Sequence, residues 1–286
     1  MKTYNDIYLA ARKRLKAEGI EAYGLEARLI ISGASGKTKE QFVRDLNLYA
    51  ADGFEKKVEE MICRRIAGEP VAYITGEWEY YGLSMTVNED VLIPRVDTEV
   101  LAEHAITLLK GRGGEKVRLL DLCCGSGCVG IAVTSNVPGC RTVLSDCSLR
   151  ALAVSRQNVL RHNLTRTVTC IEADAMKSPP MLLGQFDMIV CNPPYIPTRE
   201  LKNLDSSVRD YEPILALDGG QDGLDFYKNI SLKWKSVLKE RGCLMFECGI
   251  GQASYVYDIM KKCGFVGVEV FKDTLEIERV VAGVVL

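Results

Sequence analysis

Apolar residues recur three and four positions apart through residues 3 to about 70. This spacing predicts amphipathic helices, each with one buried face. The clearest set is Phe54, Val58, Met61, Ile62 and Ile66. Glycines that interrupt the pattern predict helix breaks at Gly19, Gly24 and Gly36. The chain is therefore expected to begin with a small helical domain.

The pattern changes at "GEPVAYITGEWEYYGLSMTVNEDVLIP", where aromatic and β-branched residues alternate with turn signals at Gly82 and at residues 88–90. Such a stretch predicts a β-hairpin. From about residue 117, short apolar runs alternate with helical segments. The runs are VRLLDL, RTVLSD, VTCIEA, FDMIV, CLMFEC, FVGVEVF and RVVAGVV. Strands that alternate with helices favour an α/β fold with an open, largely parallel sheet and right-handed crossovers.

These changes of pattern divide the chain of 286 residues into three parts. We expect a helical domain over residues 1–75, a β-hairpin linker over 76–95 and an α/β domain over 96–286. The N-terminus lacks the apolar core of a signal peptide, and no stretch has the roughly 20 apolar residues that cross a bilayer. A cytoplasmic protein without a membrane partner is therefore expected.

Net charge and cysteine content narrow the classes of protein that fit this sequence. Formal net charge is −2, with basic and acidic residues interleaved, which does not indicate a dedicated nucleic-acid-binding protein. Many of the 11 cysteines lie in apolar runs, so we expect reduced and mostly buried thiols. Cys123, Cys124 and Cys128 do not have metal-ligand spacing, and His104 and His162 are the only histidines, so no metal site is expected.

Candidate chemistry begins at "LLDLCCGSGCVGIAV", where Gly125, Gly127 and Gly130 follow a strand and open a helix. Such a loop lets the backbone approach a ligand and directs helix N–H groups at it. Asp146 ends the next strand, where a carboxylate can accept both hydroxyls of a ribose. An adenosine-bearing cofactor fits this pattern. A dinucleotide, and glycines that serve packing alone, are the alternatives.

Two further acids bear on the cofactor. Asp121 ends the strand before the glycine loop, where it could receive an ammonium or a loop N–H, and a pyrophosphate would gain nothing from its charge. Asp174 follows the third strand and could meet an adenine amino group, although a turn or cap role is equally compatible. A sulfonium methyl donor therefore fits better than a dinucleotide.

The segment "VCNPPYIP" follows the fourth strand and presents Asn192 on a backbone stiffened by two prolines. The Asn192 carboxamide and the Pro193 carbonyl supply two fixed acceptors for the hydrogens of an –NH₂ group. Tyr195 can pack against the planar group that carries this nitrogen. The motif predicts alkylation of an amide or ring nitrogen, and a plain rigid turn is the alternative.

The same residues resemble a known family. Asn-Pro-Pro-Tyr at residues 192–195 is similar to the motif of amino methyltransferases that act on adenine, cytosine or glutamine nitrogen. Together with "LIPRVDTEVL", "YEPILALDGGQDGLDFYKNI" and "FECGIGQA", the chain resembles the HemK/PrmC family of peptide chain release factor N5-glutamine methyltransferases from about residue 68 to 285. The resemblance implies a Rossmann-like class I methyltransferase domain with a mostly parallel seven-stranded sheet.

The resemblance also implies roles for individual residues. Asn192, Pro193 and Tyr195 would be catalytic, and these residues with Pro194 would bind the substrate. The resemblance assigns Asp146 to the ribose, and with the residue pattern above the expected cofactor contacts are Asp121, Cys123, Gly125, Gly127, Asp146, Asp174 and Asn192. The implied reaction uses S-adenosyl-L-methionine, releases S-adenosyl-L-homocysteine and methylates the glutamine of the Gly-Gly-Gln loop in class I release factors. The helical domain would recognise that protein substrate, and a monomer without a stable nucleic-acid partner is expected.

Two positions depart from the family pattern. Family members usually carry glycine where Cys123 stands and serine where Cys191 stands. Gly219-Gly220-Gln221 spells the substrate tripeptide itself, and we expect it to be a turn. The alternatives are a glutamine methyltransferase for a ribosomal protein, an adenine-N6 nucleic-acid methyltransferase, a nicotinamide oxidoreductase and a non-catalytic binding protein. The first two share the Asn-Pro-Pro-Tyr motif, and the third rests on the glycine loop alone.

Overall fold

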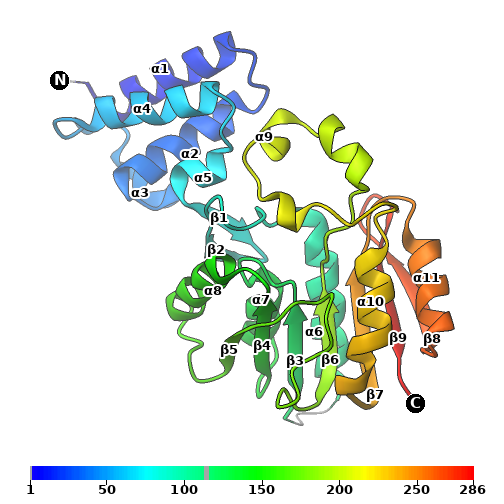
Figure 1. The fold of residues 1–286 in the computed structure, drawn as a ribbon. Helices are drawn as coiled ribbons and strands as arrows, with labels where there is room; N and C mark the ends of the chain where they lie inside the picture. The colour runs from blue at the N-terminus through cyan, green and yellow to red at the C-terminus, as the bar shows by residue number, and fades with distance from the viewer. Residues whose placement is uncertain (1, 113–115) are drawn as a thin grey trace. The chain divides into compact units, whose positions relative to one another are not determined.

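A computed structural model describes residues 2–112 and 116–286 (Figure 1). The described chain forms two compact units. The first unit runs to Glu77 and includes Asp205–Tyr211, and the second comprises Trp78–Leu204 and Glu212–Leu286. In the described ranges, no helix has both the length and the apolar character that a membrane span requires.

The first unit is helical. Its helices are α1 (Tyr4–Ala17), α2 (Tyr23–Ser35), α3 (Lys39–Asp45), α4 (Phe54–Ile66), α5 (Val71–Thr75) and α9 (Ser206–Arg209). The expected apolar face of α4 is buried at Phe54, Val58, Met61 and Ile62. Helix α9 comes from the segment 205–211, which the sequence pattern groups with residues 96–286. Tyr211 ties this segment to the unit by donating its hydroxyl to the Ala67 carbonyl at 2.9 Å.

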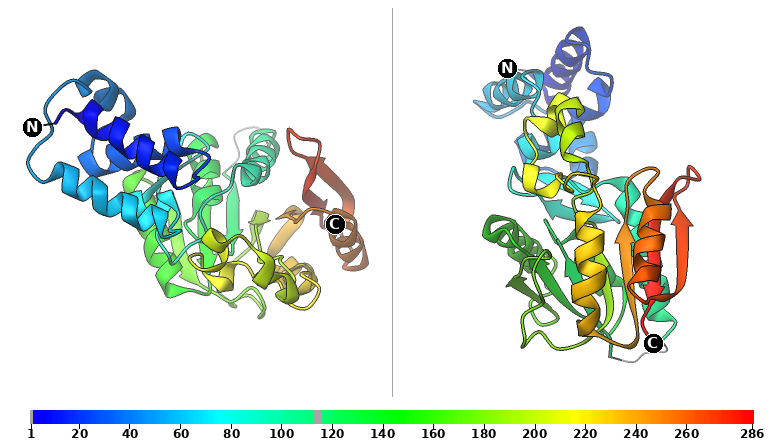
Figure 2. Two further views of the ribbon diagram at one scale, coloured as in Figure 1. Left: turned by 90° about the horizontal axis from the view of Figure 1, so that it is seen from above. Right: turned by 45° about the vertical axis from the view of Figure 1, so that its right-hand side comes forward.

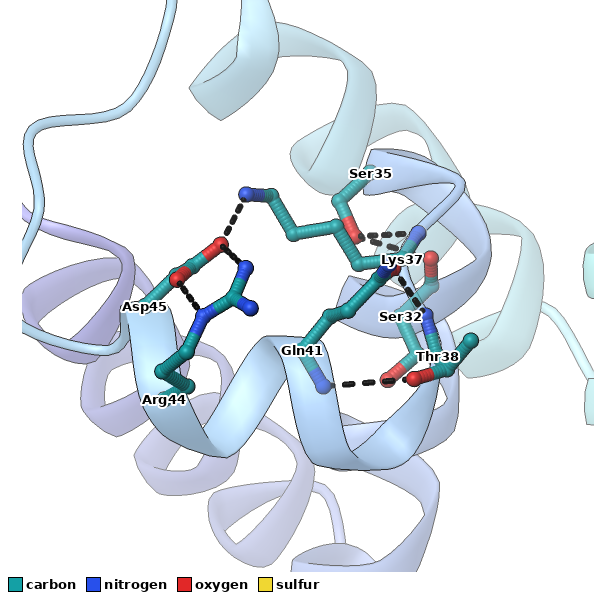
Figure 3. Close-up of polar contacts among 7 residues, drawn as sticks. All are labelled: Ser32, Ser35, Lys37, Thr38, Gln41, Arg44 and Asp45. Atoms are coloured by element: carbon teal, nitrogen blue, oxygen red, sulfur yellow. Dashed lines mark hydrogen bonds and ion pairs between the residues drawn. The ribbon is translucent and has the colours of Figure 1, made fainter.

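Polar contacts fix the junction between α2 and α3 (Figure 3). The Thr38 hydroxyl accepts from the Gln41 backbone N–H at 3.2 Å, and Gln41 Oε1 accepts from the Thr38 N–H at 3.0 Å. This capping box satisfies donors that the first turn of α3 leaves free. At the other end, Asp45 accepts from Lys37 Nζ at 2.7 Å and from Arg44 Nε at 2.8 Å. These side-chain hydrogen bonds, that from Arg44 first, lower the Asp45 pKa to about 2.

Two local expectations were wrong. Gly24 does not break a helix, because it lies in the first turn of α2 and the interruption falls between Glu18 and Ala22. The stretch expected to be β-structure from residue 68 begins instead with the short helix α5. Pro70 precedes its first residue and Gly76, with φ of 75°, ends it, which matches proline and glycine preferences at helix ends.

The predicted hairpin is present as β1 (Glu77–Tyr80) and β2 (Leu83–Thr86), with Gly82 in the turn. Within the described residues, the second unit contains one seven-stranded sheet in the order β5-β4-β3-β6-β7-β9-β8. Its strands are β3 (Arg118–Leu122), β4 (Arg141–Asp146), β5 (Val168–Glu172), β6 (Phe186–Cys191), β7 (Leu238–Glu247), β8 (Val266–Lys272) and β9 (Glu278–Val284). The first five in this order are parallel and β9 is antiparallel to both neighbours, so the expected mostly parallel fold is confirmed.

Helices cover both faces of this sheet. Helices α6 (Glu99–Lys110), α7 (Cys128–Asn136) and α8 (Leu149–Arg161) lie on one face, and α10 (Asp225–Lys233) and α11 (Ala253–Lys262) on the other (Figures 1 and 2). Short 3₁₀ helices are η1 (Val96–Thr98), η2 (Thr198–Asn203), η3 (Ile214–Ala216) and η4 (Trp234–Val237). All six residues of β6 are buried, as expected for a central parallel strand.

Candidate active site

A cavity of about 740 Å³ opens in the second unit beside the carboxyl ends of β3, β4, β5 and β6. This edge is where parallel α/β sheets bind ligands. Of the predicted site residues, seven line it: Asp121, Cys123, Gly125, Asp146, Asp174, Asn192 and Pro194. Gly127, Pro193 and Tyr195 are not among its lining residues, so their ligand contacts stay predictions.

Gly125 and Gly127, both in the glycine loop, have different structural roles. Both have positive φ, 52° and 79°. A Cβ on Gly127 would stand 2.7 Å from Leu144 Cδ1, so this glycine serves the packing of α7 on β4. A Cβ on Gly125 would meet no atom within 4 Å, so its backbone faces open space. Gly125 therefore has the conformation and the exposure of a ligand-contacting glycine.

Asp121 is almost fully buried at the end of β3, with 2% of its surface exposed. Its Oδ2 accepts the Gly130 N–H in the first turn of α7 at 2.8 Å. This is the loop N–H role foreseen for the residue, and it leaves Oδ1 for a cationic group. Burial raises the Asp121 pKa to about 7, although the Gly130 hydrogen bond acts in the opposite direction.

Asp146 lies at the end of β4, on the neighbouring strand. Its carboxylate accepts the Gly125 N–H at 2.9 Å and the Ser148 N–H at 2.9 Å. Burial raises the Asp146 pKa while these two hydrogen bonds lower it. The carboxylate therefore holds the glycine loop and also borders the cavity. Asp174 accepts the Met176 N–H at 2.9 Å, so its turn role is real, and it lines the cavity as well.

Cys123 adopts a left-handed backbone conformation, with φ of 60°. A residue with a Cβ pays roughly 1–2 kcal/mol there, whereas glycine does not. This conformation is a physical reason for the glycine that the family pattern places here. The thiol donates a hydrogen bond to Cys191, which raises the Cys123 pKa further than burial alone. Both departures from the family pattern thus lie side by side.

Asn192 directly follows β6 and lines the cavity. Its Nδ2 donates to the hydroxyl of Thr98 at 3.2 Å. Thr98 is 3% exposed and ends η1, and its carbonyl accepts the Tyr80 hydroxyl at 2.9 Å. Because its nitrogen is engaged by Thr98, the carboxamide keeps Oδ1 as the atom free to accept a ligand hydrogen.

The segment after Asn192 is held from two sides. Gln252 Nε2 donates to the Tyr195 carbonyl at 2.9 Å, and Gln252 Oε1 accepts the Gly249 N–H at 3.0 Å. On the other side, the Gly219 N–H donates to the Ile196 carbonyl at 2.9 Å. A Cβ on Gly219 would stand 2.7 Å from Tyr195 Cα. Gly219 is therefore required for backbone packing. Gln221 lies in the turn closed by the Gly223 N–H, which donates to the Gly220 carbonyl at 3.3 Å, as expected of a turn residue.

A buried acid anchors the segment that leads to Thr98. Glu212, 4% exposed, accepts the Ile93 N–H at 3.1 Å and pairs with Arg95. Thr98, Glu212, Gln252 and Glu247 are residues that sequence reasoning missed. All four lie in segments quoted for the family resemblance, and Glu247 also shares with Asp121 the signal of a lone acid ending an apolar strand.

All 11 cysteines are free thiols, six of them buried. Among the described residues, no three side chains of histidine, cysteine, aspartate or glutamate gather to hold a metal ion. His162 is the C-cap residue of α8, where its backbone N–H bonds to α8 carbonyls, whereas its ring Nε2 lies 3.0 Å from the Ser84 carbonyl of β2.

Comparison with known proteins gives consistent matches. The "PrmC N-terminal domain" family matches residues 6–76, and the "Methyltransferase small domain" family matches residues 96–208. The chain is 38% identical to the release factor glutamine methyltransferase of Geobacter sulfurreducens over 279 residues, covering 95% of this chain and 93% of the relative. It is 34% identical to that of Clostridium acetobutylicum, covering 98% and 97%.

A solved structure supports the fold. The catalytic domain of hMettl16 in complex with the MAT2A 3′UTR hairpin 1 matches with a TM-score of 0.56, 17% identity and 84% coverage of each chain. At this identity the match shows a shared fold and nothing about substrate.

Proposed function

This chain belongs to the release factor glutamine methyltransferase family, and we propose that it uses S-adenosyl-L-methionine to methylate the glutamine side-chain nitrogen N5 in the Gly-Gly-Gln loop of class I release factors. The observation that carries the proposal is Asn192, which lines the cavity with its nitrogen engaged by Thr98. Oδ1 is then the atom of the carboxamide that can accept a hydrogen from a substrate –NH₂ group.

The cavity lining fits this cofactor. Its charged side chains are the carboxylates of Glu89, Asp90, Asp121, Asp146 and Asp174 and the guanidiniums of Arg95 and Arg150. An excess of carboxylates suits a ligand with sulfonium and ammonium charges and disfavours a dinucleotide pyrophosphate. Asp121 would receive the ammonium, Asp146 the ribose, Asp174 the adenine, and Gly125 would allow close approach.

When bound, the cofactor supplies a methyl group on a positively charged sulfur and leaves as S-adenosyl-L-homocysteine. The chain's own task is to hold the amide nitrogen in position. Asn192 Oδ1 and the Pro193 carbonyl would accept its two N–H groups. In residues 2–112 and 116–286, no donor hydrogen-bonds to the Pro193 carbonyl, so that oxygen can take this role. Orientation of this kind can supply a large part of a rate enhancement.

Tyr195 would support the planar carboxamide, and Pro194 would border it. The first unit, which matches the PrmC N-terminal domain, would contact the release factor away from the reacting loop. Binding energy from such remote contacts can orient a flexible glutamine loop. We expect a monomer that works without a stable nucleic-acid partner in the cytoplasm.

Transfer of a radiolabelled methyl group tests the proposal. Purified class I release factor, ribosomes and DNA are incubated separately with enzyme and labelled cofactor. We expect label on the release factor alone. Label on ribosomal protein or on DNA, with none on the release factor, would identify one of the competing substrate classes.

A further inference from the structure

Glu247 is the last residue of β7 and lies behind the Asn192 segment. In the register of β6 and β7, Phe246 is the partner of Cys191, so Glu247 stands level with Asn192 on the neighbouring strand. Glu247 is 2% exposed, and its carbonyl accepts the Tyr227 hydroxyl at 3.0 Å. The backbone therefore fixes this acid beside the residue that presents the acceptor.

The Glu247 carboxyl is buried, and its hydrogen-bonding capacity is only partly satisfied. Within the described part of the chain, its Oε2 has no hydrogen-bond partner. Burial raises the Glu247 pKa to about 7, and hydrogen bonding from Thr98, the charge of Arg279 and hydrogen bonding from Asn192 oppose this rise. The two residues that hydrogen-bond to the carboxyl, Thr98 and Asn192, are thus the same two that the bond from Asn192 Nδ2 to the Thr98 hydroxyl joins.

Arg279 is not a dedicated counterion for Glu247. Its Nη2 lies 2.7 Å from Asp97 Oδ2, and its Nε lies 3.1 Å from Asp273 Oδ2. Two carboxylates therefore share its charge. Within the described residues, the titratable groups that interact electrostatically with Glu247 include Asp97, Arg279, Tyr80, Tyr195, Tyr227, Cys128, Cys191 and Cys248. Arg279 is the only cation among these, and an ionised Glu247 is stabilised by hydrogen bonding from Thr98, then by the shared charge of Arg279 and by hydrogen bonding from Asn192.

A buried and incompletely paired carboxyl is costly to a fold, and an apolar residue would pack in a strand end at lower cost. A role in the site is the compensating gain that the geometry offers. The Thr98 hydroxyl accepts from Asn192 Nδ2, so its own proton is available for an acceptor behind it. Glu247 is the acceptor at that position.

We propose that Glu247 is a positioning residue: its carboxylate accepts hydrogen bonds from Thr98 and Asn192, fixes the Asn192 carboxamide with Oδ1 toward the cavity, and polarises that oxygen. The inference rests on the proposed transfer to a carboxamide nitrogen. Charge-assisted hydrogen bonds are shorter and stronger than neutral ones, so the ionised form of Glu247 is the effective one. No proton needs to reach Glu247 during the reaction.

Ionisation of Glu247 should make both kcat and the free energy of unfolding depend on pH. A carboxyl whose pKa is about 7 is ionised above that pH, so kcat should fall as pH drops below about 7. Because the folded pKa exceeds the ordinary value of 4.5, the protonated group favours the folded state. That contribution to the free energy of unfolding is complete below about pH 4.5 and is lost as pH rises through about 7.

Glu247→Gln keeps the shape but removes the charge, and its –NH₂ group competes with that of Asn192. Transfer to release factor is measured from pH 5.5 to 8.5 at saturating cofactor, with S-adenosyl-L-homocysteine affinity measured by calorimetry. We expect kcat at pH 8 to fall about tenfold or more, the acid limb near pH 7 to disappear, and affinity to change less than about threefold. As pH rises, the thermal unfolding temperature of the cofactor-free Glu247→Gln variant should fall less than that of the cofactor-free natural enzyme.

Matched variants separate positioning from folding. Thr98→Val should lower kcat as Glu247→Gln does, whereas Thr98→Ser keeps the hydroxyl and should retain it. Asp187→Asn removes a carboxylate at the opposite end of β6, paired with Arg112 and Lys239, and should lower stability while kcat is kept. An unchanged kcat and acid limb in Glu247→Gln, or a loss of affinity as large as the loss of kcat, would refute the role. Absence of transfer by the unaltered enzyme would instead refute the proposed function.

Discussion

Asn192 donates from its side-chain nitrogen to the hydroxyl of Thr98 at 3.2 Å, although the two residues are 94 positions apart. The contact joins the segment after β6 to the end of η1 and fixes which atom of the carboxamide faces the cavity. Because nitrogen is the engaged atom, Asn192 presents an acceptor. An acceptor is what an –NH₂ substrate requires.

Asn192→Ala removes that acceptor and leaves the cofactor side of the cavity in place. We expect kcat to fall about 100-fold or more, by analogy with loss of one preorganised polar group at a reacting centre. The dissociation constant of S-adenosyl-L-homocysteine should change less than about threefold. Asn136→Ala, which loses only a bond to the Ala132 carbonyl in α7, is the control and should transfer normally. Equal losses of affinity and rate would contradict the acceptor role.

Cofactor affinity should depend on pH through Asp121. Its pKa is raised to about 7 by burial, so the carboxylate that would receive the ammonium is largely protonated below that pH. Affinity for S-adenosyl-L-homocysteine should therefore weaken below pH 7, by at most about tenfold per pH unit. Calorimetry at pH 6 and pH 8 measures this, with proton release expected at pH 6. Asp121→Asn should bind more weakly at pH 8 and lose the dependence, and a pH-independent natural protein would exclude the contact.

Cys123→Gly tests whether the thiol crowds the cavity. The substitution relieves a positive φ of 60° and removes Cβ and Sγ from the lining. We expect tighter binding of S-adenosyl-L-homocysteine by about fivefold, equivalent to about 1 kcal/mol. Cys123→Ala is the matched control, because it removes Sγ and keeps the strained backbone. If neither variant binds more tightly, the thiol does not obstruct the cofactor.

Gly219→Ala should disturb the site by displacing the backbone of Pro194 and Tyr195. The new Cβ would lie 2.7 Å from Tyr195 Cα and 2.8 Å from the Pro194 carbonyl oxygen, and neither backbone atom can move alone. We expect a loss of about 1–3 kcal/mol in the free energy of unfolding, together with lower kcat. Gly24→Ala is the control, since its Cβ would have only Arg12 Nε nearby, at 3.8 Å, and helix α2 should gain stability. Normal unfolding of Gly219→Ala in denaturant would contradict the packing.

Much of the site followed from the sequence because parallel strands share one carboxyl edge. Asp121, Asp146 and Asn192 each end or follow an apolar run, so the strand pattern alone brought them to one cavity. The glycine spacing likewise located the loop, although it did not separate Gly125, which faces open space, from Gly127, which packs on Leu144. That distinction depends on where a neighbouring strand places its side chains.

The sequence did not predict which residues far apart in the chain contact one another. Thr98 and Glu247 have no local signal that links them to Asn192, since their contact depends on strand order and helix placement. The membership of 205–211 in the first unit depends on tertiary packing such as that of Tyr211 on Ala67. Helix α5 was missed because its five residues are too few to show a period, and only Pro70 and Gly76 mark its ends.

The most direct test of the central claim is site-resolved mass spectrometry of a class I release factor after incubation with this enzyme and S-adenosyl-L-methionine. We predict a gain of about 14 Da, one CH₂ group, on the glutamine of the Gly-Gly-Gln peptide, absent when Asn192→Ala replaces the natural enzyme. An unmodified glutamine, or the same gain on a different residue, would contradict the account.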